Sequence, residues 1–362
     1  MKLAVFHYHL LPGGVTSVIT LSLQAAASHI PELEEILLVC GSEENLETIR
    51  ENLGPLLSKN GCRLSFAVLP ELGYTDELEA EKIGPAQLKK TLLQKFSGYI
   101  WWIHNYHIGK NPVFTRSIIE IALETPRQPV LFHIHDFPES ARYANLRFIR
   151  KFYSDSLYPA AGNIWYAVIN SRDYRLLIEA GLPKNRVVLL QNPIPGEQPV
   201  PTLDSGMRKA IEQKLSRHPH FRPGTPSLLY PVRSIRRKNA LEAGLISVLA
   251  SPRANLLLTL PGTSEQEKPY SDLVYRCFQN GSAPGAFPTA QEVPFLQIIS
   301  FSDLIVSSSV QEGFGYLFIN TVQWQKPLLA RSIDIIGDFT PFFHQGINGP
   351  CANLASIKYG ND

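Results

Sequence analysis

The stretch 303–320, DLIVSSSVQEGFGYLFIN, contains the end of a β-strand, a glycine loop and the start of a helix. Its first part is a short apolar run, and helical apolar spacing begins after Gly315. A strand that leads directly into a helix is the repeating unit of parallel sheets. The stretch therefore predicts an α/β fold, and it places one carboxylate, Glu312, at the mouth of the loop.

The same unit recurs along most of the chain. Short apolar runs such as KLAVF (2–6) and EILLVC (35–40) alternate with helix-length amphipathic stretches. Continuous apolar runs are typical of strands buried on both faces of a mostly parallel, doubly wound sheet. Further strands are expected at 63–69, 99–104, 130–135, 163–170, 186–191, 227–232, 255–260, 303–309 and 327–330, with helices at 13–30, 237–250 and 265–279.

A proline-rich segment interrupts this rhythm once and divides the chain. With 362 residues, two domains are expected. We predict an amino-terminal domain at 1–192, an interdomain segment at 193–225 with one helix near 206–217, and a carboxy-terminal domain at 226–362. Ligands bind beyond the carboxyl ends of the strands in such sheets, so the site is expected in a cleft between the domains.

The composition excludes several classes of protein. The 34 Lys and Arg residues nearly balance the 32 Asp and Glu residues, which argues against a nucleic-acid-binding surface. The four cysteines form no CxxC pair, which favours a reduced, cytoplasmic protein. No apolar run reaches about 18 residues, and residues 1–14 have the pattern of a strand rather than of a signal peptide.

Several residues of the first domain could bind a ligand. Gly13 and Gly14 precede a helix whose free N–H groups could face an anion, although a plain tight turn would also explain them. Strand alternation places His133 and His135 on one face and Asp136 on the other. The two histidines could bind a metal, but no third ligand is obvious in the sequence, so we predict no metal site.

Two further segments of the first domain have roles that the sequence leaves open. His104, Asn105 and Lys110 follow the strand expected at 99–104, where they could line the cleft or form only a polar rim. The helix expected within 139–153 is rich in arginine and aromatic residues. It could rest on an anionic membrane as a peripheral contact, although a solvated helix face is the interpretation that we favour.

In the second domain, Arg233 and Lys238 lie five residues apart where a strand turns into a helix. Two fixed cations that face a cleft suit a diphosphate. Cations are unfavourable at a helix N-terminus, so the cluster indicates an anionic ligand, with Arg236 and Arg237 expected to point into solvent.

The glycine loop supplies complementary groups. Gly313 and Gly315 free the backbone, and the amides from Phe314 to Tyr316 open a helix toward an anion or a hydroxyl-rich group. Glu312 would be repelled by phosphate but would accept hydrogen bonds from sugar hydroxyls. Together, acid, amides and cations indicate a phosphate joined to a sugar.

These motifs resemble the retaining nucleotide-sugar glycosyltransferases of the GT-B fold, the large group that includes sucrose synthases and bacterial mannosyltransferases. The resemblance covers nearly the whole chain and implies two Rossmann-like domains that face each other across a cleft. It is carried by PGGV (12–15), HIHD (133–136), VINSRDYRLLIEAGLPKNRVVLLQNPI (168–194), VRSIRRK (232–238) and DLIVSSSVQEGFGYLFIN (303–320).

The resemblance is incomplete at three places. The family pattern G-R-x-x-x-x-K-G keeps only Arg233 and Lys238 here, without its glycines. In the family motif of two glutamates separated by seven residues, Glu312 matches the first acid and Asn320 stands in place of the second. The chain ends soon after 344–349, which resembles the family's H-G-x-N-G turn, so we expect a short, truncated second domain.

For the second domain, the resemblance implies a donor site. Arg233 and Lys238 would hold the diphosphate of the donor. Glu312 and the amides after Gly313 would bind the donor sugar, and Asn320 would meet the ribose hydroxyls.

For the first domain, the resemblance implies that His135 reaches the donor sugar. Gly13 and Gly14 would lie beside the phosphates and the acceptor. The implied activity moves a sugar from a UDP- or GDP-linked donor to an unidentified acceptor, with retention of anomeric configuration. Neither a metal nor another cofactor is expected, because cations and helix ends neutralise the leaving group. A non-catalytic nucleotide-sugar-binding protein and a GT-B phosphorylase or epimerase are the alternatives.

Overall fold

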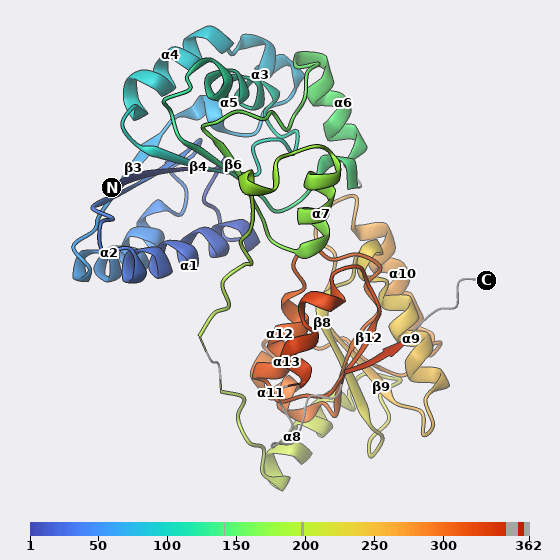
Figure 1. Cartoon of the computed structure of the whole chain (residues 1–362). Helices are drawn as coiled ribbons and strands as arrows, with labels where there is room; N and C mark the ends of the chain where they lie inside the picture. Colours follow the sequence, from blue (N-terminus) through green and yellow to red (C-terminus); the bar gives the residue numbers. More distant parts are fainter. Residues whose placement is uncertain (141, 197–198, 345–353, 358–362) are drawn as a thin grey trace. The chain divides into compact units, whose positions relative to one another are not determined.

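The computed structural model describes residues 1–140, 142–196, 199–344 and 354–357. The chain divides into two compact units, Met1–Pro195 and Gly196–Asp362 (Figure 1). Each unit contains one parallel sheet with helices on both faces, as the apolar runs predicted. Within the described residues, every helix is too short or too polar to span a bilayer.

Unit 1 contains a seven-stranded sheet in the order β3-β2-β1-β4-β5-β6-β7. All of its strand pairs are parallel, and the order reverses between β1 and β4, which is where ligands bind in folds of this class. The strands are β1 (Lys2–Phe6), β2 (Glu35–Cys40), β3 (Arg63–Val68), β4 (Ile100–His104), β5 (Val130–Ile134), β6 (Ile164–Val168) and β7 (Val187–Leu189).

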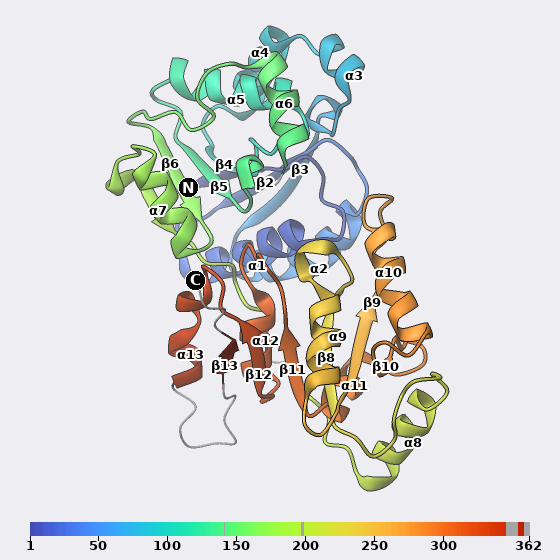
Figure 2. The ribbon, with the colours of Figure 1, turned by 90° about the vertical axis from the view of Figure 1, so that its right-hand side faces the viewer.

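Helices cover both faces of the unit 1 sheet. Apolar side chains of α1 and α2 pack on one face, and those of α4 and α5 pack on the other (Figures 1 and 2). This burial explains why the strands lack polar alternation. The helices are α1 (Gly14–His29), α2 (Leu46–Lys59), α3 (Glu77–Lys82), α4 (Pro85–Phe96), α5 (Pro112–Glu124), α6 (Tyr143–Phe152) and α7 (Ser171–Glu179).

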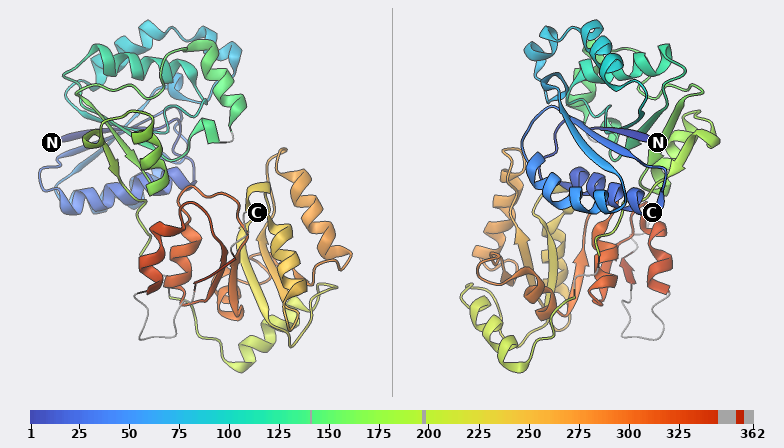
Figure 3. Two further views of the ribbon diagram at one scale, coloured as in Figure 1. Left: turned by 45° about the vertical axis from the view of Figure 1, so that its right-hand side comes forward. Right: turned by 90° about the vertical axis from the view of Figure 1, so that its left-hand side faces the viewer.

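Unit 2 contains a six-stranded parallel sheet in the order β10-β9-β8-β11-β12-β13. Helices α9 and α10 lie on one face and α12 and α13 lie on the other (Figures 2 and 3). The strands are β8 (Ser227–Arg233), β9 (Asn255–Leu260), β10 (Gly285–Ala286), β11 (Leu304–Ser307), β12 (Leu328–Arg331) and β13 (Leu354–Ile357). The helices are α8 (Ser205–Leu215), α9 (Ala240–Leu249), α10 (Lys268–Gln279), α11 (Phe295–Phe301), α12 (Tyr316–Gln323) and α13 (Thr340–His344).

Helix α8 falls within the segment expected to cross between the domains, and it packs in unit 2. Ile211 and Leu215 are buried, and Lys214 donates to the carbonyl of Glu292 at 2.9 Å. The turn expected at 344–349 extends into residues 345–353, which lie outside the described part of the chain.

Candidate functional site

A carboxylate and two cations meet at the carboxyl edge of the unit 2 sheet. Strands β8 and β11 are neighbours in the sheet, so the loops that follow them lie side by side. Lys238 forms an ion pair with Oε1 of Glu312, and Arg237 Nη1 lies 3.3 Å from Oε2. The side chains of Lys238 and Glu312 are only 15% and 10% exposed, so water screens this pair weakly. The structure therefore brings together the acid and the lysine that the sequence predicted.

A network of hydrogen bonds from Ser309 and Tyr230 holds this ion pair in place. Ser309 donates from Oγ to Oε1 of Glu312 at 2.6 Å, and the Tyr230 hydroxyl lies 2.8 Å from Ser309 Oγ. The same hydroxyl donates to the carbonyl of Lys238 at 2.8 Å. Burial raises the pKa of Tyr230 to about 12, so it remains a donor at neutral pH. The network holds the loops after β8 and β11 in one arrangement.

The two cations of the predicted diphosphate clamp differ in their surroundings. Burial lowers the pKa of Lys238, and the adjacent Glu312 offsets part of that shift. Arg233 is half exposed and lies 3.4 Å from Glu267. Glu267 in turn accepts a hydrogen bond from the backbone N–H of Thr263, in the loop after β9. No sequence pattern singles out Glu267, which orients Arg233 at the sheet edge.

Arg237 was expected to point into solvent; its side chain is 48% exposed, and it also contacts Glu312, which was not expected. Its guanidinium donates to the carboxylate of Glu312 at 3.3 Å and to the carbonyl of Gln311 at 3.4 Å. Between them, Arg237 and Lys238 engage both oxygens of Glu312. The only signal in the sequence was the run of three basic residues, which does not say which of them contacts the acid.

The loop between β11 and α12 needs glycine at position 315. Gly315 has φ +87°, and a Cβ there would lie 2.7 Å from the Phe318 ring. The ring of the buried Phe314 packs edge-on against Phe339, with ring centroids 5.7 Å apart. Asn320 lies half-buried on α12. The backbone amides from Gly313 to Tyr316 thus precede and open a helix at the same edge as Lys238.

At the start of α1, by contrast, a Cβ on Gly13 or Gly14 would clash with no described atom. Gly13 is extended, with φ 174°, and a Cβ added to it would have the Leu11 carbonyl oxygen as its nearest neighbour, at 3.9 Å. A Cβ on Gly14 would meet no atom of the described chain within 4 Å. The space beside these glycines is open, which is what the approach of a ligand to the backbone requires.

Three buried histidines gather at the carboxyl edge of unit 1. His133 and His135 share one face, as predicted, with ring centroids 4.3 Å apart. His104 joins them because β4 pairs in parallel with β5, and its Nδ1 lies 2.9 Å from Nε2 of His135. Burial lowers the pKa of all three, so they are neutral at pH 7.

Within the described residues, these three histidines are the cluster of potential metal ligands that could hold an ion. The candidate ligand atoms of His104, His133 and His135 all lie within 4.8 Å of one another. The third histidine, which was not obvious in the sequence, becomes apparent only once β4 and β5 are aligned. The hydrogen bond between His104 and His135 already gives two of these nitrogens a partner. The absence of a functional metal therefore stays a prediction.

Comparison with known proteins gives one relative along most of the chain. A mannosylglucosyl-3-phosphoglycerate synthase from Petrotoga mobilis is 36% identical over 346 residues. The match covers 93% of this chain and 66% of the synthase, so the chain spans just under two thirds of that relative. No protein-family model matches the chain.

Several solved structures share the two-unit architecture. The Anabaena protein Alr3699/HepE in complex with UDP-glucose has a TM-score of 0.57 at 16% identity, covering 93% of this chain and 82% of that chain. The lipopolysaccharide outer core galactosyltransferase WaaB in its apo form has a TM-score of 0.55 at 13% identity, covering 91% and 80%. WaaG, a glycosyltransferase involved in lipopolysaccharide biosynthesis, has a TM-score of 0.56 at 11% identity, covering 99% and 87%.

Proposed function

We propose that this chain, which shares its fold with glycosyltransferases such as WaaB and WaaG, transfers a sugar from a nucleotide-diphosphate sugar to an acceptor, with retention of anomeric configuration. The observation that carries this proposal is the cluster of Lys238, Arg237 and Glu312 at the carboxyl edge of unit 2. Cations and an acid in contact suit a ligand that joins a diphosphate to a hydroxyl-rich group.

In this proposal, donor binding rearranges the ion pair. Lys238 forms its ion pair with Oε1 of Glu312. A diphosphate beside Lys238 and Arg233 would compete for the ammonium group and leave a carboxylate oxygen free. That oxygen would then accept hydrogen bonds from the donor sugar, as a charge-assisted contact roughly twice as strong as a neutral one. Diphosphate and sugar would therefore support each other's binding.

The chemical step breaks the bond between the anomeric carbon and the phosphate oxygen, and it forms a bond from that carbon to the acceptor oxygen. The acceptor proton passes to the departing phosphate oxygen. Lys238 and Arg233 stabilise the negative charge that develops on the diphosphate, which is the largest contribution in reactions of this kind. Retention follows if both events occur on one face of the sugar.

The remaining residues have proposed roles around the donor. Asn320 meets the ribose of a UDP or GDP donor, and the amides from Gly313 to Tyr316 meet the sugar. In unit 1, His135 is proposed as a sugar contact, and the open space beside Gly13 and Gly14 is proposed to admit phosphates and the acceptor. A bound metal is not required in this proposal.

The name of the Petrotoga relative describes a product that contains 3-phosphoglycerate. We extend to this chain the proposal that its acceptor is small and carries an anionic group. A lipid or a large glycan acceptor would contradict this extension without affecting the proposal of sugar transfer.

A ligand screen followed by product analysis tests the function. UDP, GDP and ADP, and the sugars linked to them, should raise the melting temperature according to ligand concentration divided by Kd. NMR of the product should show the anomeric configuration of the donor. Nucleotide binding without any transfer would instead indicate a non-catalytic binding protein, and formation of a sugar phosphate from inorganic phosphate would indicate a phosphorylase.

A further inference from the structure

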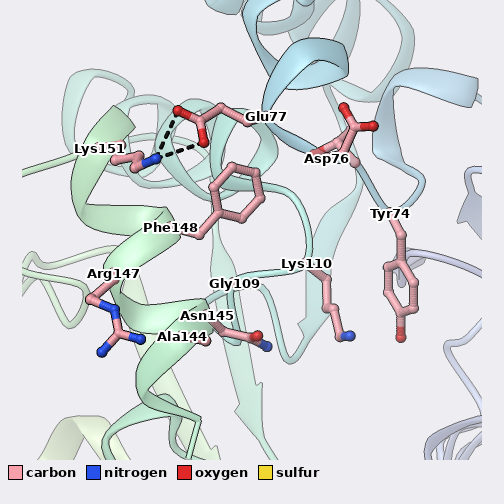
Figure 4. Close-up of a pocket in the computed structure, with 11 residues that line it drawn as sticks. Tyr74, Asp76, Glu77, Gly109, Lys110, Ala144, Asn145, Arg147, Phe148 and Lys151 are labelled. Atoms are coloured by element: carbon pink, nitrogen blue, oxygen red, sulfur yellow. Dashed lines mark hydrogen bonds and ion pairs between the residues drawn. The ribbon is translucent and has the colours of Figure 1, made fainter. Parts of the chain in front are cut away.

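Unit 1 contains a pocket of about 540 Å³ near the loops that follow β3 and β4 (Figure 4). Its walls come from residues 74–77, from Gly109 and Lys110, and from the side of α6 that carries Asn145, Arg147 and Lys151. This volume is within the range of small-molecule sites, about 300–1,000 Å³. The pocket belongs to the carboxyl edge of the sheet, where ligands of such folds bind.

Hydrogen bonds and close packing hold the walls of the pocket together. Asn145 donates from Nδ2 to the carbonyl of Ile108 at 2.8 Å, and the N–H of Thr75 donates to the carbonyl of Lys110 at 2.9 Å. Gly109 has φ +73°, and a Cβ there would lie 2.5 Å from the carbonyl oxygen of Asn145. Only glycine lets α6 approach the β4 loop this closely. The pocket is therefore defined by fixed backbone.

The acids of the pocket already have partners. The Asp76 carboxylate accepts from the N–H of Glu79 and caps α3. Glu77 forms an ion pair with Lys151 at 2.6 Å, drawn at the upper left of Figure 4. Glu77 is thus paired with a cation, and Asp76 directs one carboxylate oxygen to the start of α3.

Two other cations of the pocket, Lys110 and Arg147, differ from Lys151 in this respect. Across residues 1–140, 142–196, 199–344 and 354–357, no ion pair joins Lys110 or Arg147 to an acid. The Lys110 ammonium lies 4.9 Å from the centre of the Tyr74 ring. Burial, and then the nearby Arg142, lower the pKa of Lys110, so its positive charge is held at a cost. An anion in the pocket would reduce that cost.

A membrane is a poorer match for this surface than a small anion. Of the apolar residues of α6, Ile149 is buried, and Leu146, Phe148 and Phe152 pack against the core of unit 1. Tyr143 is the large apolar side chain of the helix that is well exposed, at 62%. A helix that inserts into a bilayer surface needs an exposed apolar face, which α6 uses for the core instead.

We propose that this pocket binds the anionic end of the acceptor, a phosphate or carboxylate group, through Lys110 and Arg147. Figure 4 shows both side chains extending in the same direction, with Asn145 drawn between them. Lysine and arginine suit oxyanions, and Asn145 adds an amide at the wall. The proposal rests on the function proposed above, and it gives the acceptor a defined chemistry and place.

Calorimetry with a simple probe tests this site directly. The probe is 3-phosphoglycerate. Glycerate, which lacks the phosphate, and glycerol, which lacks both the phosphate and the carboxylate, serve as analogues. Lys110→Gln and Arg147→Gln should each weaken 3-phosphoglycerate binding by roughly tenfold or more, as expected for loss of a charge-assisted hydrogen bond. Lys90→Gln removes the same charge from an exposed position of α4 and should leave binding unchanged.

A parallel titration with UDP or GDP separates this inference from the proposed function. Both pocket variants should bind the nucleotide as the wild type does. If 3-phosphoglycerate binds and the variants weaken it, while the nucleotide does not bind, the anion site stands and the proposed function fails. No 3-phosphoglycerate binding by the wild type, or equal binding by all variants, overturns the inference.

Vesicles of phosphatidylglycerol provide the remaining arm of the test. Lys110→Gln and Arg147→Gln should leave vesicle binding at the level of Lys90→Gln. If they instead abolish vesicle binding and leave 3-phosphoglycerate binding intact, the surface serves a membrane and the inference is wrong.

Discussion

In unit 2, Glu312 is held by Lys238, Arg237 and Ser309 at once. A carboxylate with so many donors is positioned by the protein before any ligand arrives, which is what preorganised electrostatic stabilisation requires. The sequence singled out Lys238 through its five-residue spacing from Arg233, and Glu312 through its place at the mouth of the glycine loop. It could not identify Ser309 or Tyr230, because their contribution depends on two loops that only the β8–β11 pairing brings together.

The two cations of the proposed clamp should respond differently to truncation. Arg233→Ala and Lys238→Ala should each lose about 2–4 kcal/mol of transition-state stabilisation, measured from kcat/KM. Only Lys238→Ala should also lower the free energy of unfolding of unit 2, by about 1–3 kcal/mol, because it leaves the buried Glu312 with fewer partners. Arg233 is half exposed, and such pairs contribute little to stability.

Arg236→Ala is the matched control for these two variants, since it removes a neighbouring exposed cation. Its kcat/KM and its unfolding curve should match those of the wild type. Near-wild-type activity in both Arg233→Ala and Lys238→Ala would exclude these residues as a diphosphate clamp.

Asn320 is proposed to contact the ribose of the donor. Asn320→Glu should tighten binding of the free nucleotide diphosphate by about 0.5–1.5 kcal/mol, and Asn320→Ala should weaken it, because a carboxylate is the stronger acceptor. Calorimetry with the nucleotide measures both effects. Analogues lacking a ribose hydroxyl should bind all three proteins with more similar affinities. Unchanged affinity in both variants would exclude Asn320 as a ribose ligand.

Among the single elements, the start of a helix serves different purposes in the two units. The glycine before α12 is required by the fold, whereas Gly13 and Gly14 at the start of α1 face open space. The sequence could mark both loops as glycine-rich. It could not distinguish them, because the distinction depends on φ and on which atoms surround the missing Cβ.

Alanine at these glycines should separate the two purposes. Gly315→Ala should lower the free energy of unfolding by about 1–3 kcal/mol, because φ is +87° and the new Cβ meets the Phe318 ring. Gly14→Ala should leave stability unchanged and raise KM for donor or acceptor, because any obstruction would be to the ligand. Chemical denaturation and steady-state kinetics measure the two effects. Loss of stability in Gly14→Ala would contradict the ligand role.

The buried histidines around β4 and β5 make unit 1 sensitive to acid. Burial lowers the pKa of His107 from 6.5 to about 3, with the backbone of Asp136 offsetting part of the shift. Between pH 6.5 and 3, His107 is protonated in the unfolded chain but stays neutral in the folded state. The free energy of unfolding is therefore unaffected by this histidine above pH 6.5. It falls as pH decreases toward 3, by roughly 1.4 kcal/mol per pH unit from His107 alone.

His107→Phe should reduce this acid sensitivity. The ring packs against Tyr106, Tyr158 and Phe137, so an aromatic replacement keeps the packing while it removes the titrating group. Chemical denaturation between pH 4.5 and 7.5 gives the free energy of unfolding at each pH. At the acidic end of this range, its slope against pH should correspond to about one bound proton fewer in the variant. Equal slopes in both proteins would mean that His107 is not held neutral in the folded state.

For the molecule as a whole, the α/β architecture and the resemblance to the GT-B glycosyltransferases were predicted from the sequence and are confirmed. Apolar runs located β2 and β9 to the residue, because strands buried on both faces need such runs. The two-residue β10 carries too few residues for any pattern, and β13 was not predicted either. Likewise, the contacts of Glu267 with Arg233 and of Arg237 with Glu312 are tertiary contacts that no local pattern predicts.

Metal independence is a prediction for the whole protein. Turnover in excess EDTA should equal turnover with added Mg²⁺, because Arg233 and Lys238 are proposed to neutralise the leaving group. Metal analysis of the purified protein should find less than one equivalent at His104, His133 and His135. A strict requirement for a divalent ion would contradict the proposed binding of the diphosphate.

Release of nucleoside diphosphate from a panel of UDP- and GDP-sugars is the most direct test of the proposed sugar transfer. It is measured with 3-phosphoglycerate and its glycosides as acceptors, for the wild type and for Lys238→Ala. We expect the wild type to release UDP or GDP with one donor class and to form a glycoside in equal amount. Lys238→Ala should be slower by roughly 30-fold or more, the factor that corresponds to loss of one such group. No release by a wild type that binds the nucleotide, or equal rates in both proteins, would contradict the proposed transfer.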